Sequence, residues 1–210
     1  MPLLASNDCA CSRCGLPLDA GFTVLAETIC ETCFADPPPF LHCYAPYLYV
    51  FPLDQLIARM KYQRRPQLSR LLAKLMIQSR QLDLVQQQPL PDLLVPVPMH
   101  PKKQHQRGYN QTIYLARHLG HHLGIPVISD AIEKIHNTEA QNALNANQRK
   151  ANLSGSFRIN PKRRQALMQY SHIGVVDDVI TTGATVMAVS GCLTALGPDE
   201  ISAWAIARTP

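Results

Sequence analysis

The stretch IGVVDDVITTGAT, residues 173–185, places the tightest constraint on the fold of this chain. Its apolar start ends at two acids, and a turn rich in threonine follows at once. A short, wholly apolar strand is typical of a parallel sheet that helices cover on both faces. Apolar residues then recur at helical spacing, at Val186, Val189, Leu193 and Leu196. The stretch therefore predicts a strand, a turn and a helix in succession.

The rest of the chain repeats this alternation of strands and helices. Two helical stripes come first, over Leu53–Met60 and over Leu68–Met76. The apolar run LLVPVP, residues 93–98, predicts a buried strand that ends at its prolines, because proline cannot donate to a central ladder. A helical stripe over Leu115–Leu123 and an apolar strand over Ile201–Ala207 follow. This order predicts an α/β domain over residues 45–210, with a parallel sheet flanked by helices.

Composition and the first residues narrow the class of protein. No apolar run approaches the ~18 residues that a membrane span requires, so we expect no membrane insertion. The start of the chain, MPLLASNDCACSRC, resembles no signal peptide, and we expect a cytoplasmic protein. The net charge of +5 is lower than dedicated nucleic-acid-binding domains usually carry. Local clusters of Lys and Arg suit anionic ligands from phosphate to DNA, or form an ordinary solvated surface.

Six of the seven cysteines lie within the first 43 residues. The spacing of Cys11, Cys14, Cys30 and Cys33 matches a four-cysteine zinc site, in which two tight turns complete a closed tetrahedron around a structural ion. Either Cys9 or Cys43 could replace one ligand. A disulfide framework is the competing interpretation, and the absence of a secretion signal disfavours it. The sequence therefore predicts an N-terminal zinc module over residues 1–44.

The acids and the turn near residue 180 suggest a sugar-phosphate site. Ligands of open parallel sheets bind beyond the carboxyl ends of the strands, and a helix N-terminus offers free N–H groups to a phosphate. The phosphate-binding stretch would be Thr181, Thr182, Gly183, Ala184 and Thr185. Asp177 and Asp178 would accept hydrogen bonds from ribose hydroxyls, and carboxylates also hold Mg²⁺. The alternative is that both acids merely cap the helix and the turn is an ordinary loop.

With these residues identified, the chain resembles the type I phosphoribosyltransferases, and more closely the ComF competence-protein family, which includes GntX-like proteins. VVDDVITTGAT resembles the family motif for phosphoribosyl pyrophosphate (PRPP), and CSRCGLPL with CETC and PPPF resembles its zinc module. RMKYQRR, LLVPVPMHPKKQHQRGYNQ, TEAQNALNANQRKANLSGSF and ARTP also match family stretches. Many relatives carry a further CxxC pair upstream, whereas this chain has the lone Cys9, so we expect one zinc ion.

The resemblance implies a role for individual residues. Asp177 and Asp178 would hold the ribose of PRPP together with Mg²⁺, and the stretch 181–185 would hold its 5′-phosphate. Pro96, Val97 and Pro98 would form the pyrophosphate loop. Lys61 and Arg107 would neutralise pyrophosphate, and these two cations would complete the catalytic set with the acid pair. A lid is expected at residues 136–153, with Arg149 reaching inward.

Two functions agree with this resemblance. The first is an enzyme that acts in natural competence and DNA uptake and transfers phosphoribosyl to an acceptor, with release of pyrophosphate. The second is a sensor of PRPP or a nucleotide that does no chemistry. Such an adaptor would bind single-stranded DNA, or a competence or DNA-processing protein, through its zinc module and basic loops. No motif in the sequence selects a purine, pyrimidine or amine acceptor.

Overall fold

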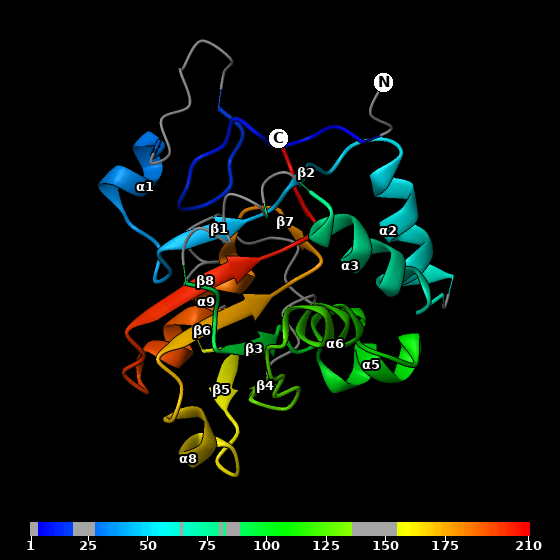
Figure 1. The fold of residues 1–210 in the computed structure, drawn as a ribbon. Helices are drawn as coiled ribbons and strands as arrows, with labels where there is room; N and C mark the ends of the chain where they lie inside the picture. Colours follow the sequence, from blue (N-terminus) through cyan, green and yellow to red (C-terminus); the bar gives the residue numbers. More distant parts are fainter. Residues whose placement is uncertain (1–3, 19–27, 64, 80–81, 83–88, 136–154) are drawn as a thin grey trace.

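The computed structural model describes residues 4–18, 28–63, 65–79, 82, 89–135 and 155–210 (Figure 1). At its centre is a four-stranded sheet of strand order β1-β8-β6-β3, in which all neighbouring strands are parallel. The strands span His42–Tyr44 (β1), Leu93–Pro96 (β3), His172–Val176 (β6) and Glu200–Trp204 (β8). This sheet, with the helices on its faces, confirms the α/β fold class expected from the sequence.

Three short strands continue the sheet after a break of two residues. They span Tyr47–Leu48 (β2), Val179–Ile180 (β7) and Ala207–Arg208 (β9), and pair in the order β2-β9-β7. β2 follows β1, β7 follows β6 and β9 follows β8, with an unchanged register of pairing. Asp177 and Asp178 occupy the break between β6 and β7. The sequence pattern predicted that the turn follows the acids directly. In the structure, β7 lies between the acids and the turn.

Alternate residues of the sheet pack against helices on opposite faces. Val175 and Ala203 belong to the hydrophobic cluster that includes α9 (Ala184–Thr194). Val176 and Trp204 belong to the cluster on the other face, which includes the helices grouped together in Figure 1. These helices are α2 (Leu53–Tyr62), α3 (Leu68–Ile77) and α6 (Gln111–Leu123). Because each buried Val or Leu contributes about 1.5–3 kcal/mol, both layers stabilise the sheet.

Helix α6 begins and ends where its capping residues predict. The Asn110 side chain accepts the N–H of Thr112 at the N-terminus, and Gly124 adopts a left-handed conformation at the C-terminus.

The remaining described helices are short: α1 (Glu31–Ala35), α5 (Pro101–Arg107) and α8 (Arg164–Leu167). Strands β4 (Ile132–Lys134) and β5 (Phe157–Ile159) form an antiparallel pair.

Two further expectations concern segments of the chain. The lid at residues 136–153, with Arg149, lies outside the described residues. Strand β1 belongs to the range 1–44 expected for the zinc module, and it pairs with β8 in the main sheet. Within the described residues, no helix combines the length and the hydropathy that a membrane span requires.

Candidate functional site

The four cysteines predicted to bind zinc form a compact cluster. The Sγ atoms of Cys11, Cys14, Cys30 and Cys33 all lie within 4.8 Å of one another. The Sγ atoms of Cys14 and Cys30 are 3.8 Å apart. Zinc–sulfur bonds of about 2.3 Å in a tetrahedron require sulfurs about 3.8 Å apart, so the cluster has the dimensions of such a site. The cluster could therefore hold a structural metal ion such as zinc.

Local backbone geometry builds the first half of this cluster. The Gly15 N–H donates to the Cys11 carbonyl at 2.8 Å, and Gly15 has a φ of +69°, a conformation that L side chains rarely adopt. A Cβ atom at Gly15 would also lie 2.9 Å from the Cys43 Sγ atom. The Cys30 N–H donates to the Cys11 Sγ atom at 3.3 Å, which ties the two cysteine pairs together. Glycine is therefore required at this turn both for its conformation and for space.

The clustered thiols affect one another's acidity. Hydrogen bonding with Cys14 lowers the pKa of Cys11 to about 4, whereas burial raises the pKa of Cys33 to about 12. The first thiolate forms readily, and further ionisation adds like charges in a half-buried space. A divalent cation relieves that repulsion, which is why zinc binding releases protons from clustered thiols.

The remaining cysteines lie outside the cluster. All seven are free thiols, so the disulfide alternative finds no pairing in the structure. Cys43 is fully buried beside Gly15, and burial raises its pKa to about 12. Cys192 donates to the Phe157 carbonyl at 3.3 Å and packs against the α9 side of the core.

Asp178 is the centre of a buried polar network. Its Oδ1 atom lies 2.8 Å from the Lys61 Nζ atom, and its Oδ2 atom accepts the Gln111 amide at 2.7 Å. The Gln111 Oε1 atom in turn accepts from Arg107 at 2.9 Å, and the Arg107 guanidinium stacks over the Tyr62 ring at 5.3 Å. Three residues predicted separately are thus joined, with Gln111 as the link. Their roles toward a ligand remain predictions.

The Lys61–Asp178 pair is largely buried, with Asp178 more enclosed than Lys61. The exposed fraction is 20% for the Lys61 side chain and 4% for that of Asp178. Burial alone would lower the pKa of Lys61, but the Asp178 carboxylate outweighs it and holds the pKa above its ordinary value. Lys61 therefore remains charged, and its charge is already compensated within the protein.

Asp177 differs from its neighbour in its contacts and in its exposure to solvent. Its backbone N–H pairs with the Trp204 carbonyl at 2.8 Å, and its Oδ1 atom accepts the N–H of Asp178 at 2.8 Å. The side chain is half-buried. Burial and the adjacent Asp178 charge raise the pKa of Asp177 to about 7, against the opposing effect of Lys61. The charge of Asp177 therefore changes near neutral pH.

The turn after β7 leads into α9 as the sequence predicts. Gly183 is the N-cap residue of α9, with a φ of +77°, and the Ala184 N–H lies 3.3 Å from the Thr182 Oγ1 atom. Thr181 and Thr182 are exposed, and Gly183 to Thr185 are half-buried. The first N–H groups of α9 thus lie at an accessible surface beyond the carboxyl ends of β6 and β7. Such groups favour an anion.

The loop expected to bind pyrophosphate lies beside the acid pair. Pro96 pairs with Val176 at the end of β3, and the Val97 N–H donates to the Val176 carbonyl at 2.8 Å. The Val97 carbonyl accepts from Asn110 at 3.0 Å and from Thr112 at 2.7 Å. The loop Pro96–Pro98 is therefore fixed to the N-terminus of α6, whose first residue is Gln111.

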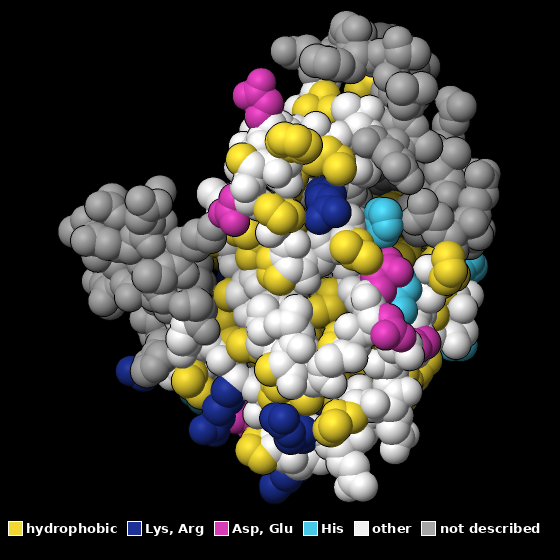
Figure 2. Space-filling view, turned by 90° about the vertical axis from the view of Figure 1, so that its left-hand side faces the viewer, with side chains coloured by type: hydrophobic (Ala, Val, Ile, Leu, Met, Phe, Trp, Pro, Cys, Tyr) yellow, Lys and Arg dark blue, Asp and Glu magenta, His cyan; other side chains and the backbone are white. Residues whose placement is uncertain are grey.

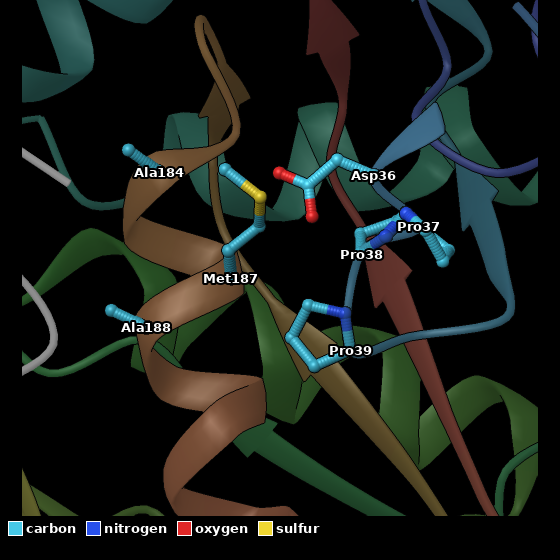
Figure 3. Close-up of a pocket in the computed structure, with 7 residues that line it drawn as sticks. All are labelled: Asp36, Pro37, Pro38, Pro39, Ala184, Met187 and Ala188. Atoms are coloured by element: carbon cyan, nitrogen blue, oxygen red, sulfur yellow. The ribbon is translucent and has the colours of Figure 1, made fainter. Parts of the chain in front are cut away.

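A small cavity adjoins the predicted phosphate turn. Its volume is about 190 Å³, and it separates the proline-rich segment after α1 from the first turns of α9 (Figure 3). The Asp36 carboxylate and the Met187 sulfur point toward one another across it. The lining residues are Asp36, Pro37, Pro38, Pro39, Ala184, Met187 and Ala188. The cavity shares Ala184 with the predicted PRPP-binding stretch.

One cluster of basic residues lies away from this site. In Figure 2, basic side chains gather at the lower end of the face shown, which is the end where α8 lies in Figure 1. Lys162, Arg163 and Arg164 lie at the start of α8 or just before it and are exposed, and Arg163 pairs with Asp130 at 2.9 Å. Strand β7 lies toward the other end of the molecule. The solvated-surface interpretation fits these three residues.

Sequence reasoning assigned no role to several residues that organise the site. Asn110, Gln111 and Thr112 lie within the matched stretch RGYNQ or next to it, and Arg208 lies within the matched ARTP. Arg208 donates to the carbonyls of Ile180 and Thr181. Only the family resemblance drew attention to these stretches, because neither spacing nor periodicity distinguishes their polar residues.

Fold and site together define an α/β protein with a parallel sheet and an N-terminal cluster of four cysteines that could hold a metal ion. No protein-family model matches the chain. Competence protein F of Haemophilus influenzae is 32% identical over 94% of this chain and 84% of its own length. DNA utilization protein YhgH is 34% identical in Salmonella typhi and 32% in Escherichia coli K12, over 95% of this chain and 84% of each relative. The chain belongs to the competence protein F (ComF) family.

Proposed function

We propose that this chain binds PRPP, or a related ribose 5-phosphate, in support of competence and the utilization of DNA. The arrangement at β7 and α9 carries the proposal. An acid with a pKa of about 7 precedes an exposed turn in which Gly183 starts a helix, at the edge where parallel strands end. The relatives support the biological role through their names, competence protein F and DNA utilization protein YhgH.

The two acids have unequal parts in this proposal. Asp178 has both carboxylate oxygens engaged, by Lys61 and Gln111, and is almost fully buried. Asp177 is half-buried and engages one oxygen with the adjacent backbone. We therefore assign the ribose hydroxyls chiefly to Asp177, and to Asp178 the task of fixing the lysine and glutamine beside it. The 5′-phosphate would accept from the turn at residues 181–185.

Magnesium enters the proposal through its preference for carboxylate and phosphate oxygens. Asp177 is the accessible carboxylate of the site and would lie beside Mg²⁺ carried by PRPP. The metal would neutralise pyrophosphate charge, and the residues of this chain would bind and orient the sugar. Transfer of the phosphoribosyl group requires an acceptor, and a screen for pyrophosphate release over candidate acceptors tests that step.

Calorimetric titration of the zinc-loaded protein with PRPP and Mg²⁺ tests the binding. Asp177→Asn should weaken binding by about tenfold or more, because a charge-assisted hydrogen bond is lost. Asp130→Asn is the matched control, since the Asp130 side chain is half exposed and its partner among the described residues is Arg163. Equal affinities of the wild type and Asp177→Asn for PRPP would contradict the site. So would binding of pyrophosphate alone as tightly as PRPP.

The biological part needs a separate test. Cells that lack this chain can be assayed for DNA uptake or for growth on DNA as a nutrient. The wild type and the Asp130→Asn control should restore that uptake or growth. Asp177→Asn should fail to restore it. Full restoration by Asp177→Asn would separate the role in DNA utilization from the ribose-phosphate site.

A further inference from the structure

Arg208 contacts two parts of the molecule that are far apart in the sequence. It lies in β9 with an exposed fraction of 7%. Its Nε atom donates to the Cys14 carbonyl at 3.2 Å. Its Nη1 atom donates to the carbonyls of Ile180, at 3.3 Å, and Thr181. One buried guanidinium thus contacts both the cysteine cluster and the start of the predicted phosphate turn.

The charge of Arg208 strengthens this connection. Within the described residues, its acceptors are carbonyl and hydroxyl oxygens, at Cys14, Ile180, Thr181 and Thr209. A buried guanidinium needs a compensating charge, which neutral oxygens do not supply. Four thiolates around one Zn²⁺ ion carry a net charge of −2. A filled metal site next to Cys14 would therefore supply a negative charge that the acceptors of Arg208 in the described part of the chain do not.

The field of Arg208 reaches the sulfurs of this region. Burial raises the pKa of Cys43 to about 12, and the positive charge of Arg208 opposes that rise. Cys43 packs closely against Gly15, the residue that follows Cys14, since a Cβ placed on Gly15 would lie 2.9 Å from the Cys43 Sγ atom. The hydrogen bond from Arg208 to the Cys14 carbonyl places the guanidinium next to the cysteine cluster itself.

We propose that Arg208 is a positioning residue that makes the conformation of the turn at residues 181–185 depend on the metal in the cysteine cluster. Metal loss would remove the counter-charge and release the Cys14 carbonyl, so the guanidinium would lose its fixed position beneath Ile180 and Thr181. Ribose-phosphate binding would then require a filled metal site. This last consequence rests on the proposed function, whereas the coupling itself does not.

Amide hydrogen exchange measures the coupling without any ribose phosphate. The reporter amides are those of Ala184, which faces the Thr182 hydroxyl, and Thr209, which donates to the Ile180 carbonyl at 3.0 Å. The reference amide is Val97, which donates to the Val176 carbonyl at 2.8 Å on the far side of β6. Removing zinc from the wild type with a chelator should speed exchange at the reporters by about tenfold and leave the reference unchanged.

Arg208→Lys supplies the decisive variant, because it keeps the charge and loses the planar guanidinium that spans both sites. It should retain about one zinc per chain, exchange about tenfold faster than the wild type at the reporters with zinc bound, and show no further increase without zinc. Arg163→Lys is the control, since Arg163 is exposed and pairs with Asp130. It should behave as the wild type.

Three results would overturn the coupling. One is unchanged reporter exchange when zinc is removed from the wild type. Another is a wild-type response to zinc in Arg208→Lys. The third is an equal increase at Val97, which would show a general loosening of the sheet. Failure of PRPP to bind the zinc-loaded wild type would refute the proposed function. The exchange experiment would still test the coupling, because it uses no ribose phosphate.

Discussion

The Lys61–Asp178 pair offers the sharpest test of how the site is built. The two charges are 2.8 Å apart, and their side chains are 20% and 4% exposed. Removing one partner of a buried pair costs about 3–5 kcal/mol, because the other charge is left without compensation. Lys61→Met should destabilise the fold by about 3 kcal/mol, at the lower end because water reaches the lysine. Asp178→Asn should cost about 2 kcal/mol, since Lys61 can then turn toward solvent.

A double-mutant cycle separates the pair from its surroundings. The double variant should cost about 3 kcal/mol instead of the sum of about 5, which gives a coupling free energy of about 2 kcal/mol. Urea unfolding of the zinc-loaded protein can be followed by the emission of Trp204, the single tryptophan. Trp204 is buried, and its carbonyl accepts the Asp177 N–H, so it reports on this region.

The control is an exposed pair of similar geometry. Arg163 and Asp130 lie 2.9 Å apart with side chains 48% and 52% exposed, and Arg163→Met should change the unfolding free energy by less than about 1 kcal/mol. Two results together would refute this account of the pair: Lys61→Met is no less stable than Arg163→Met, and the double-mutant cycle shows no coupling free energy. Lys61 would then be a free cation available to a ligand, as the sequence alone suggested.

Three shorter predictions address the acid, the metal and DNA. Affinity for ribose phosphate should rise about tenfold from pH 6 to pH 8, because the pKa of Asp177 is about 7 and only the ionised carboxylate accepts hydrogen bonds from two hydroxyls. Calorimetry at both pH values measures this rise, which Asp177→Asn should remove. Metal analysis should find about one zinc per chain, lost in Cys33→Ser and kept in Cys43→Ser; the reverse would reassign the ligands. If cations bind single-stranded DNA directly, affinity must fall steeply with added salt, and a flat response in a filter-binding titration points to a protein partner.

Periodicity and motif chemistry predicted the parts of the fold that depend on local sequence. The apolar run before Asp177 forms β6, and the stripe from Val186 to Leu193 forms the buried face of α9. Each cysteine pair is held as its spacing requires, because a tight turn joins Cys11 to Cys14 and the first turn of α1 joins Cys30 to Cys33. Such features need only neighbouring residues, so they can be inferred without knowing the rest of the chain.

Contacts between distant parts of the chain could not be inferred in this way. Nothing in the local pattern around Lys61 indicates that its partner is Asp178, or that Gln111 bridges Asp178 and Arg107. Strand β7 was missed because two residues are too few to produce a period. The function of Arg208 depends on a contact with Cys14, near the opposite end of the sequence. Such pairings follow from the order of strands, which a single sequence does not encode locally.

The parallel sheet explains why these distant residues meet at one place. Since β1, β3, β6 and β8 run in the same direction, the segments that follow them emerge at one edge. These are the strand β2, the loop Pro96–Pro98, the acid pair with β7, and β9 with Arg208. The short second sheet then binds three of them together in register. The proposed anion site at this edge therefore lies between the α6 network on one side and the cysteine cluster on the other, and the coupling proposed for Arg208 would carry a change at the cysteine cluster to the turn.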